Sequence, residues 1–366
     1  MSCSQKPPAK EQTFPAGFGC CQRIYPRKRA LQEFVLVILL LVFTFPITQD
    51  YEWLEYFAGT GNLTRVMASS QYKAARFDVM DHKQEPRERS NFMDLTHASG
   101  FALATLYLLR GMADNFGAHF GMKCSSFCKV NVGTSARSPC SALGFEEYPS
   151  VQLGNMLLER SCCLILLTTC LGGVWSLEQP SGSLAEFYPA FRETIRRIFD
   201  AGGPSAVHQV SWWMGHYKSR TPKRHWAYCN SVRIHKLNKG VLQGWKKKKG
   251  DKKVVTAEKY VDREGRKRWK GTPALKGTEV YPVPFAREFC DMLEDLKVTC
   301  KGQPQLPDPV PSAVSSFEQL EWADKSVWRY LRLESVYNYL RRHKRLTIPV
   351  EWRGLMPKRL HEVSEG

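Results

Sequence analysis

The chain has 366 residues, which is enough for one large α/β domain or two smaller ones. Its 53 lysine and arginine residues against 35 acidic residues give a formal net charge of +18 at pH 7. This balance indicates a polyanionic partner, either nucleic acid or an acidic membrane surface, although a basic tail on an unrelated domain would give the same sum. The 12 cysteines form no C-x-x-C pair, which argues against a zinc ribbon and a disulfide framework. We therefore expect free thiols, no metal site, and a reducing compartment, the nucleus or the cytoplasm.

The first part of the chain changes from polar to strongly apolar. Residues 1–33 are polar and proline-containing, which predicts disorder. Residues 34–45 form an unbroken apolar run within a segment ending at Pro46, and basic residues precede it, so it resembles a signal anchor. The run is shorter than the roughly 18–20 residues that span a bilayer. A strand is also predicted from residue 51, only a few residues further on. A membrane span at residues 34–45 would crowd the sheet of that strand against the bilayer. We favour a helix or strand buried in the protein or covered by a partner; a membrane anchor and a non-native extension are the alternatives.

The pattern of residues 51–64 predicts a strand, a glycine turn and a helix that together bind a nucleotide. A strand of interleaved aromatic, aliphatic and acidic residues runs into Gly59-Thr60-Gly61, and a helix is predicted from Asn62 to Ser70. Glycine allows a tight turn and close approach of a ligand, and the amide groups at a helix start attract polar or anionic groups. The sequence therefore predicts that a nucleotide-like ligand binds at this turn.

The residues after the glycines narrow the choice of ligand. Asp78 follows Gly59 by nineteen residues, at the end of a second predicted strand, where an acid can accept hydrogen bonds from ribose hydroxyls. Leu63-Thr64 stand where the last glycine of a G-x-G-x-x-G pattern would be, so no pyrophosphate cradle is evident. This favours S-adenosylmethionine over NAD. An Asp78 that simply faces solvent is the alternative.

Strand and helix patterns alternate over residues 51–230. Strands are predicted at 74–79, 115–122, 174–177, 206–213 and 225–229, and helices at 101–110, 153–169 and 184–201. This alternation predicts an α/β fold with a doubly wound, mostly parallel sheet, in one domain over residues 47–300. Ligands in such folds bind at the carboxyl ends of the strands.

Two reactive side chains follow predicted strands. Cys124 lies in a loop beside Lys123, whose ammonium group would favour the nucleophilic thiolate; a structural cysteine is the alternative. Glu178 ends a buried strand before Gln179-Pro180, a place suited to acid/base work or base recognition; a carboxylate that points into solvent is the alternative.

The C-terminal third is basic. Residues 236–276 hold fifteen lysines or arginines and four acids, which predicts an insertion that is a β-hairpin or mobile and contacts phosphates; ordinary solvated lysines are the alternative. A helix is predicted at 285–296, a proline-rich linker at 301–316 and a basic helical segment at 317–366. We expect nucleic-acid contacts from the basic side chains Arg220, Lys223, Arg224, Lys246, Lys247, Lys248 and Lys249.

Taken in order, four segments resemble the motif series of cytosine-C5 DNA methyltransferases, a family of the class I S-adenosylmethionine-dependent superfamily: Phe57-Ala58-Gly59-Thr60-Gly61, Asp78, Lys123-Cys124-Ser125-Ser126-Phe127-Cys128 and Glu178-Gln179-Pro180. The resemblance implies a Rossmann-like methyltransferase fold. It implies that Cys124 attacks C6 of a flipped cytosine while Glu178 holds the N3 and N4 edge. Tyr281-Pro282 is similar to the segment that closes the family's cofactor pocket. The implied residues for S-adenosylmethionine are Phe57, Ala58, Gly59, Thr60, Gly61, Asp78 and Asp94.

The chain departs from the family pattern at three places. Lys123 replaces a proline, Gln179 replaces an asparagine, and the basic residues 219–224 do not form the family's R-x-R motif. The predicted function is a divergent S-adenosylmethionine-dependent methyltransferase acting on nucleic acid, DNA in preference to RNA. The alternatives are a catalytically inactive nucleic-acid-binding protein on a methyltransferase scaffold, and a basic protein associated with membranes through residues 34–45.

Overall fold

The computed structural model describes residues 24–44, 46–79, 93–113, 115–203, 205–243, 254–265, 267–299 and 342. The lysine run at 246–249, the proline-rich linker at 301–316 and, apart from residue 342, the C-terminal segment lie outside the described residues. Helix α1 (Ile24–Thr44) begins inside the segment predicted to be disordered, so that prediction is wrong for residues 24–33. The apolar run is therefore the second half of a longer helix.

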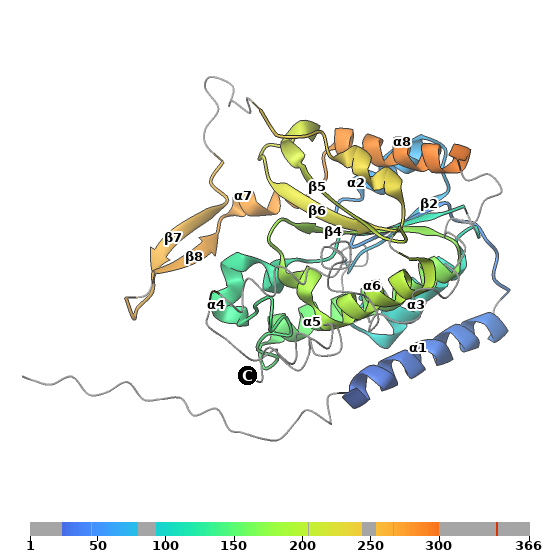
Figure 1. Cartoon of the computed structure of the whole chain (residues 1–366), viewed down its shortest axis with the longest axis horizontal. Helices are drawn as coiled ribbons and strands as arrows, with labels where there is room; N and C mark the ends of the chain where they lie inside the picture. The colour runs from blue at the N-terminus through green and yellow to red at the C-terminus, as the bar shows by residue number, and fades with distance from the viewer. Residues whose placement is uncertain are drawn as a thin grey trace, which may run out of the picture.

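A six-stranded sheet forms the centre of the fold, with the strand order β2-β1-β3-β4-β6-β5 (Figure 1). The first four strands in this order are parallel, and β6 runs antiparallel to both of its neighbours. The predicted α/β class and mostly parallel sheet are thus confirmed. The strands are β1 (Trp53–Tyr56), β2 (Ala74–Phe77), β3 (Gly117–Phe120), β4 (Val174–Pro180), β5 (His208–Trp213) and β6 (Arg224–Cys229).

Helices cover both faces of this sheet, and each face has its own apolar core. Side chains alternate along β1, so Leu54 and Tyr56 join one core while Trp53 joins the other. The first core lies under α3 (Ala98–Leu109), α5 (Pro149–Cys170) and α6 (Pro189–Gly202). The second lies under α2 (Asn62–Ser69) and α8 (Val283–Thr299), on the opposite face (Figure 1). The strands are buried on both faces, as parallel strands in α/β proteins usually are.

Helix α5 is the helix of the described residues that is long and apolar enough, by length and composition, to cross a membrane. More than half of its apolar stretch, 56%, is buried inside the protein. Gly173, just beyond the helix, lies so close to Phe116 that an added Cβ would come within 2.5 Å of the ring. This close packing and burial identify α5 as a core helix.

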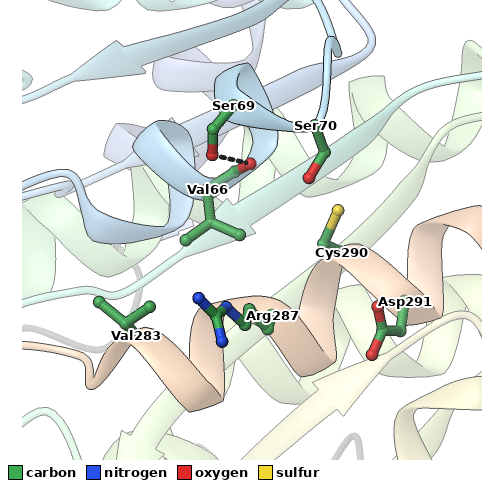
Figure 2. A pocket seen from close by; sticks show the side chains of 7 residues that line it. All are labelled: Val66, Ser69, Ser70, Val283, Arg287, Cys290 and Asp291. Atoms are coloured by element: carbon green, nitrogen blue, oxygen red, sulfur yellow. Dashed lines mark hydrogen bonds between the residues drawn. The ribbon is translucent and has the colours of Figure 1, made fainter.

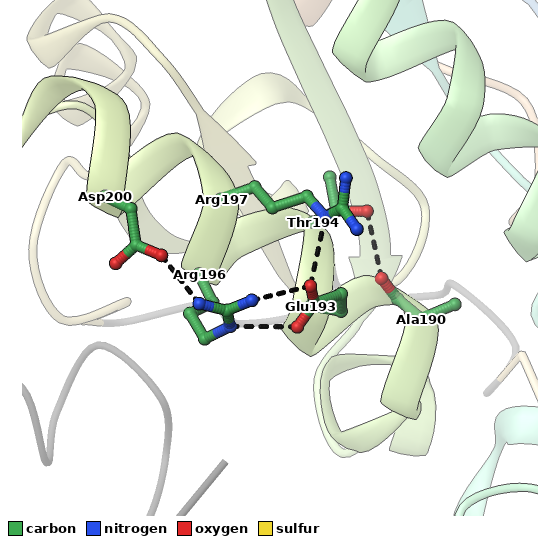
Figure 3. Close-up of polar contacts among 6 residues, drawn as sticks. All are labelled: Ala190, Glu193, Thr194, Arg196, Arg197 and Asp200. Atoms are coloured by element: carbon green, nitrogen blue, oxygen red, sulfur yellow. Dashed lines mark hydrogen bonds and ion pairs between the residues drawn. The ribbon is translucent and has the colours of Figure 1, made fainter. Parts of the chain in front are cut away.

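Helix α6 is amphipathic and begins later than expected. Pro189 disfavours a helical conformation in the residue before it, so the predicted helix divides into a 3₁₀ turn at Leu184–Phe187 and α6. On the outer face, Arg196 binds both carboxylate oxygens of Glu193, at 2.9 and 2.7 Å, and also binds Asp200 (Figure 3). Exposed pairs of this kind stabilise a helix by about 0.3–0.5 kcal/mol each.

The basic insertion contains a β-hairpin, one of its two predicted forms. Strands β7 (Ala257–Val261) and β8 (Lys267–Gly271) pair antiparallel and stand away from the main sheet, followed by α7 (Pro273–Lys276) (Figure 1). Tyr260 and Trp269 are exposed on this hairpin, and the Lys259 Nζ atom lies 5.0 Å from the centre of the Trp269 ring. The hairpin therefore presents cations and aromatic rings, and none of its described residues belongs to either of the two apolar cores.

Candidate functional site

The turn after β1 has an unusual backbone. Phe57, Gly59 and Gly61 all adopt left-handed conformations, with φ of 59°, 52° and 67°. A left-handed conformation costs a non-glycine residue about 1–2 kcal/mol, and such outliers gather at functional sites. Among the described residues, no atom lies within 4 Å of a Cβ added to Gly59, so this part of the turn borders open space. A ligand can therefore approach the backbone here.

The two predicted cofactor acids lie in different places. Asp78, just beyond β2, accepts a hydrogen bond from the Gly59 amide at 2.8 Å and so holds the glycine turn. Asp94 lies in the turn before α3 and accepts hydrogen bonds from the amide and hydroxyl of Thr96. Partial burial opposes its ionisation, but these bonds and His97 lower its pKa overall. Among the described residues, the side-chain bonds of Asp94 reach the start of α3 and not the glycine turn.

Cys124 lies in the loop after β3, where its carbonyl accepts hydrogen bonds from the amides of Phe127 and Cys128. We expected Lys123 to favour the Cys124 thiolate, and this is wrong. A hydrogen bond shared with Cys128, together with burial, raises the pKa of Cys124 well above its ordinary value. The same hydrogen bond lowers the pKa of Cys128. The ammonium group that opposes the rise at Cys124 belongs to Lys223, which is distant in sequence.

A buried arginine fixes the Cys124 loop. Arg137 follows the short helix α4 (Val132–Ser135) and donates hydrogen bonds to the carbonyl and hydroxyl of Ser126 at 3.1 and 3.0 Å. It also donates to the Val151 carbonyl, and its guanidinium lies 3.8 Å from the Phe127 ring centre. Burial lowers the pKa of Arg137 to about 10, so it remains charged at neutral pH. These contacts of Arg137 fix the conformation of the loop that contains Cys124.

Gln179 fixes the same loop from the neighbouring strand. Its Nε2 donates to the Met122 carbonyl at 2.6 Å, and its Oε1 accepts a hydrogen bond from Ser183. Gln179 is fully buried. The residue that replaces the family's asparagine thus has a clear structural role at the end of β3.

Glu178 is a buried carboxylate with both oxygens engaged. His225 Nδ1 is bonded to Oε1, and the Tyr281 hydroxyl donates to Oε2 at 2.6 Å. Burial alone would raise the pKa of Glu178. The charge and hydrogen bond of His225 and the bond from Tyr281 outweigh it, so the pKa falls to about 2. Glu178 is therefore ionised and paired, rather than facing solvent.

Tyr281 joins the separate parts of the site. Its hydroxyl lies 3.1 Å from His119 Nε2 on β3, and its carbonyl accepts a hydrogen bond from Asn62 at the start of α2. Burial lowers the pKa of His119 to about 4, which makes this imidazole neutral at pH 7. Burial and the charges of Glu178, Glu55 and Cys124 raise the pKa of Tyr281. The structure thus brings Cys124 and Glu178 to one side of the sheet, around Tyr281.

Glu55 is a further buried acid that sequence reasoning passed over. On β1, its Oε2 accepts hydrogen bonds from the amide and hydroxyl of Thr64, at 2.8 and 2.5 Å. Burial raises the pKa of Glu55 to about 7, although the Thr64 bonds oppose this. The sequence signal was an acid in an otherwise apolar strand, immediately before the glycine turn.

The predicted nucleic-acid residues divide into two groups. Arg220 and Arg224 are exposed, and the Arg224 guanidinium lies 5.6 Å from the Trp213 ring centre. Lys223 instead acts electrostatically on Cys124, Cys128 and Glu178, so its charge belongs to the site. Lys246, Lys247, Lys248 and Lys249 lie outside the described residues.

A cavity of about 370 Å³ lies between α2 and α8 (Figure 2). The residues that line it come from the later turns of α2 and from α8, whereas the candidate site lies at the start of α2. They are Val66, Ser69, Ser70, Val283, Arg287, Cys290 and Asp291.

Comparisons of this chain with protein-family models, curated proteins and solved structures gave no match. The functional assignment therefore depends on the residues of the site.

Proposed function

We propose that this chain is a divergent class I S-adenosylmethionine-dependent methyltransferase that modifies cytosine in nucleic acid, DNA in preference to RNA. The observation that carries the proposal is that Tyr281 links the separate segments: its carbonyl accepts a hydrogen bond from Asn62, directly after the left-handed turn at Phe57–Gly61, and its hydroxyl donates to Glu178, which acts electrostatically on Cys124. The sheet supports a doubly wound, Rossmann-like methyltransferase fold. Among the described residues, the reversed strand of this sheet, β6, lies next to the edge strand β5 and leaves the four strands from β2 to β4 parallel.

The glycine turn fits the cofactor. Bound S-adenosylmethionine would supply a methyl group on a positively charged sulfur. The open space beside Gly59 would admit a ligand to the backbone of residues 57–61. In this proposal Asp78, which accepts a hydrogen bond from the Gly59 amide, also accepts one from a ribose hydroxyl. The role of Asp94 near the adenine ring remains a prediction from the family resemblance.

The chemistry at the base requires a rearrangement of Glu178. The Cys124 sulfur would attack C6, and the electron pair would move to C5, which would take the methyl group as the methyl–sulfur bond of S-adenosylmethionine breaks and S-adenosylhomocysteine leaves. Loss of the C5 proton to water would then expel the Cys124 sulfur from C6 and restore the aromatic ring. Both oxygens of Glu178 are engaged, so a flipped base must displace Tyr281 to reach it. Losing this donor raises the pKa of Glu178, while the charge and hydrogen bond of His225 continue to lower it. Lys223 favours the Cys124 thiolate.

Binding of cofactor tests the first half of the proposal. We expect purified protein to bind S-adenosylmethionine in calorimetry, and Asp78→Asn to weaken this binding about tenfold or more, because the ionised acceptor for the ribose is lost. Asparagine keeps an acceptor for the Gly59 amide. Asp200→Asn, on the outer face of α6, is the matched control and should bind as the wild type does. If the wild-type protein gives no heat with S-adenosylmethionine or S-adenosylhomocysteine, the proposal fails.

The β7–β8 hairpin supports nucleic acid as the substrate. Lysines and exposed aromatic rings on a two-stranded ribbon suit phosphate contact and base stacking. We expect the triple variant Lys259→Glu, Lys267→Glu, Lys270→Glu to lower the affinity for duplex DNA at least about tenfold at 0.1 M salt and to flatten its salt dependence. A control with the same charge change at exposed basic residues outside the insertion, Lys73→Glu, Arg197→Glu, Lys218→Glu, should lose much less. Equal losses in an electrophoretic mobility assay would assign binding to net charge alone.

The raised pKa of Cys124 and the fully engaged Glu178 also favour a second candidate, a nucleic-acid-binding protein without catalysis on the same scaffold. The two candidates differ in methyl transfer, which the Cys124 variant in the Discussion measures.

A further inference from the structure

Helix α1 has one face packed on the protein and an apolar face turned outward. Phe34 and Leu41 are buried and Ile38 is partly buried, and the Phe34 ring stacks on Phe101 of α3 at 5.3 Å. Leu36, Leu40 and Phe43 are exposed by 64%, 64% and 84%. Both sets follow the helical spacing i, i+4, i+7, so they lie on opposite faces. Val35, Leu39 and Val42 are also exposed and widen the outer face.

This outer face is a contiguous apolar surface of six side chains. Single exposed apolar residues are ordinary in soluble proteins, but a contiguous patch marks an interaction site. The apolar part of α1, Phe34–Thr44, is too short to span a bilayer, and its inner face already packs on α3. An occupant must therefore bind the outer face from the side, parallel to the helix.

We propose that α1 binds an anionic lipid surface, lying flat in the membrane interface with its outer face among the acyl chains. The first turns of the same helix contain Arg27, Lys28 and Arg29, and the whole chain carries a net charge of +18. Anionic head groups complement this charge, while the acyl boundary accepts the apolar stripe. A second copy of this chain would bring one basic helix against another, so charge disfavours that occupant.

This orientation avoids the crowding of a membrane span. Figure 1 shows α1 on the outer side of α3, at the periphery of the molecule. A helix lying flat there leaves the sheet on the aqueous side of the interface. The membrane contact is independent of the proposed methyltransferase activity, since α1 shares no residue with the candidate site.

Vesicle co-sedimentation of the full-length chain tests this proposal. Vesicles of phosphatidylcholine alone are compared with vesicles that contain about 30% phosphatidylserine. We expect the wild type to bind the anionic vesicles at least about tenfold more strongly, and added salt to weaken binding. The variant Leu36→Ser, Leu40→Ser, Phe43→Ser should lose binding to them. The matched control replaces exposed valines elsewhere, Val130→Ser, Val232→Ser, Val241→Ser, and should bind as the wild type does.

Three results would overturn the proposal. The first is wild-type protein that stays in solution with both kinds of vesicle. The second is equal binding by the α1 variant and the wild type. The third is wild-type protein that is dimeric in light scattering without lipid and becomes monomeric in the α1 variant, since that result assigns the face to a second copy. Circular dichroism melting checks that both variants remain folded, which is expected because all substituted side chains are exposed.

Discussion

Replacing Cys124 by serine will reduce methyl transfer to cytosine by at least about a thousandfold and leave the affinity for S-adenosylmethionine unchanged. The hydroxyl is a far weaker nucleophile than a thiolate, so the attack on C6 is lost. Cys124 lies in the loop after β3, separate from the glycine turn, so cofactor binding does not depend on its sulfur. Serine has nearly the same size, and Arg137 holds the loop independently of Cys124.

Transfer of a labelled methyl group to duplex DNA measures this loss. A second readout uses DNA with 5-fluorocytosine. The reaction releases the cysteine only when C5 loses its proton, and a fluorine in place of that hydrogen cannot be lost, so the cysteine–C6 bond persists as a stable adduct. Cys128→Ala is the matched control: it should keep the adduct and the rate, because it removes only the hydrogen bond that raises the pKa of Cys124. A wild-type rate in the Cys124 variant would exclude Cys124 as the nucleophile. Wild-type protein that binds S-adenosylmethionine and DNA but forms no adduct would favour the non-catalytic candidate.

Replacing Glu55 by glutamine will remove a loss of stability of roughly 2–3 kcal/mol that the wild type undergoes between pH 5 and pH 8.5. Burial raises the folded-state pKa of Glu55 from 4.5 to about 7. A raised pKa means that the folded state binds the proton more tightly. The stability from this group is thus fully present below pH 4.5 and is lost as the pH rises through 7. Two to three pKa units correspond to roughly 3 kcal/mol, an order-of-magnitude value.

Glutamine avoids the buried negative charge and keeps an oxygen for the Thr64 amide and hydroxyl. Denaturant unfolding at a series of pH values measures the difference between variant and wild type, in which the titration of the other groups cancels. Glu279→Gln, at an exposed position before Tyr281, is the control and should give a difference that does not depend on pH. The prediction is contradicted if the Glu55 variant behaves in the same way.

The sequence predicted the central sheet well because the signals are local. A short apolar strand followed by a helix indicates a parallel strand, and this signal does not depend on distant residues. Strands β1 to β4 follow this rule. The reversed direction of β6 was not predictable from its own residues, because direction depends on pairing with β4 and β5. The start of α1 was missed since the basic residues before the apolar run resemble a disordered flank as much as a first helical turn.

Part of the candidate site could also be predicted, because its position depends on local signals. Gly59 and Cys124 follow strands and Glu178 lies in the last part of β4, so all three could be placed near the carboxyl ends of the parallel strands. The groups that set their chemistry come from distant segments: His225 and Tyr281 reach Glu178 across 47 and 103 residues. The electrostatic partner of Cys124 was therefore assigned to its neighbour Lys123 instead of Lys223.

Tyr281 also sets when this site can form during synthesis. Its carbonyl binds Asn62 across 219 residues, and Phe285 and Phe289, which follow it, belong to the second core. A ribosome releases the chain from its N-terminus, so α3, α5 and the strands they cover emerge well before residue 281. We expect the first core to assemble while the second face of the sheet is still open. The candidate site is therefore completed only when residue 281 has emerged, and any protein truncated before it lacks the hydroxyl that donates to Glu178.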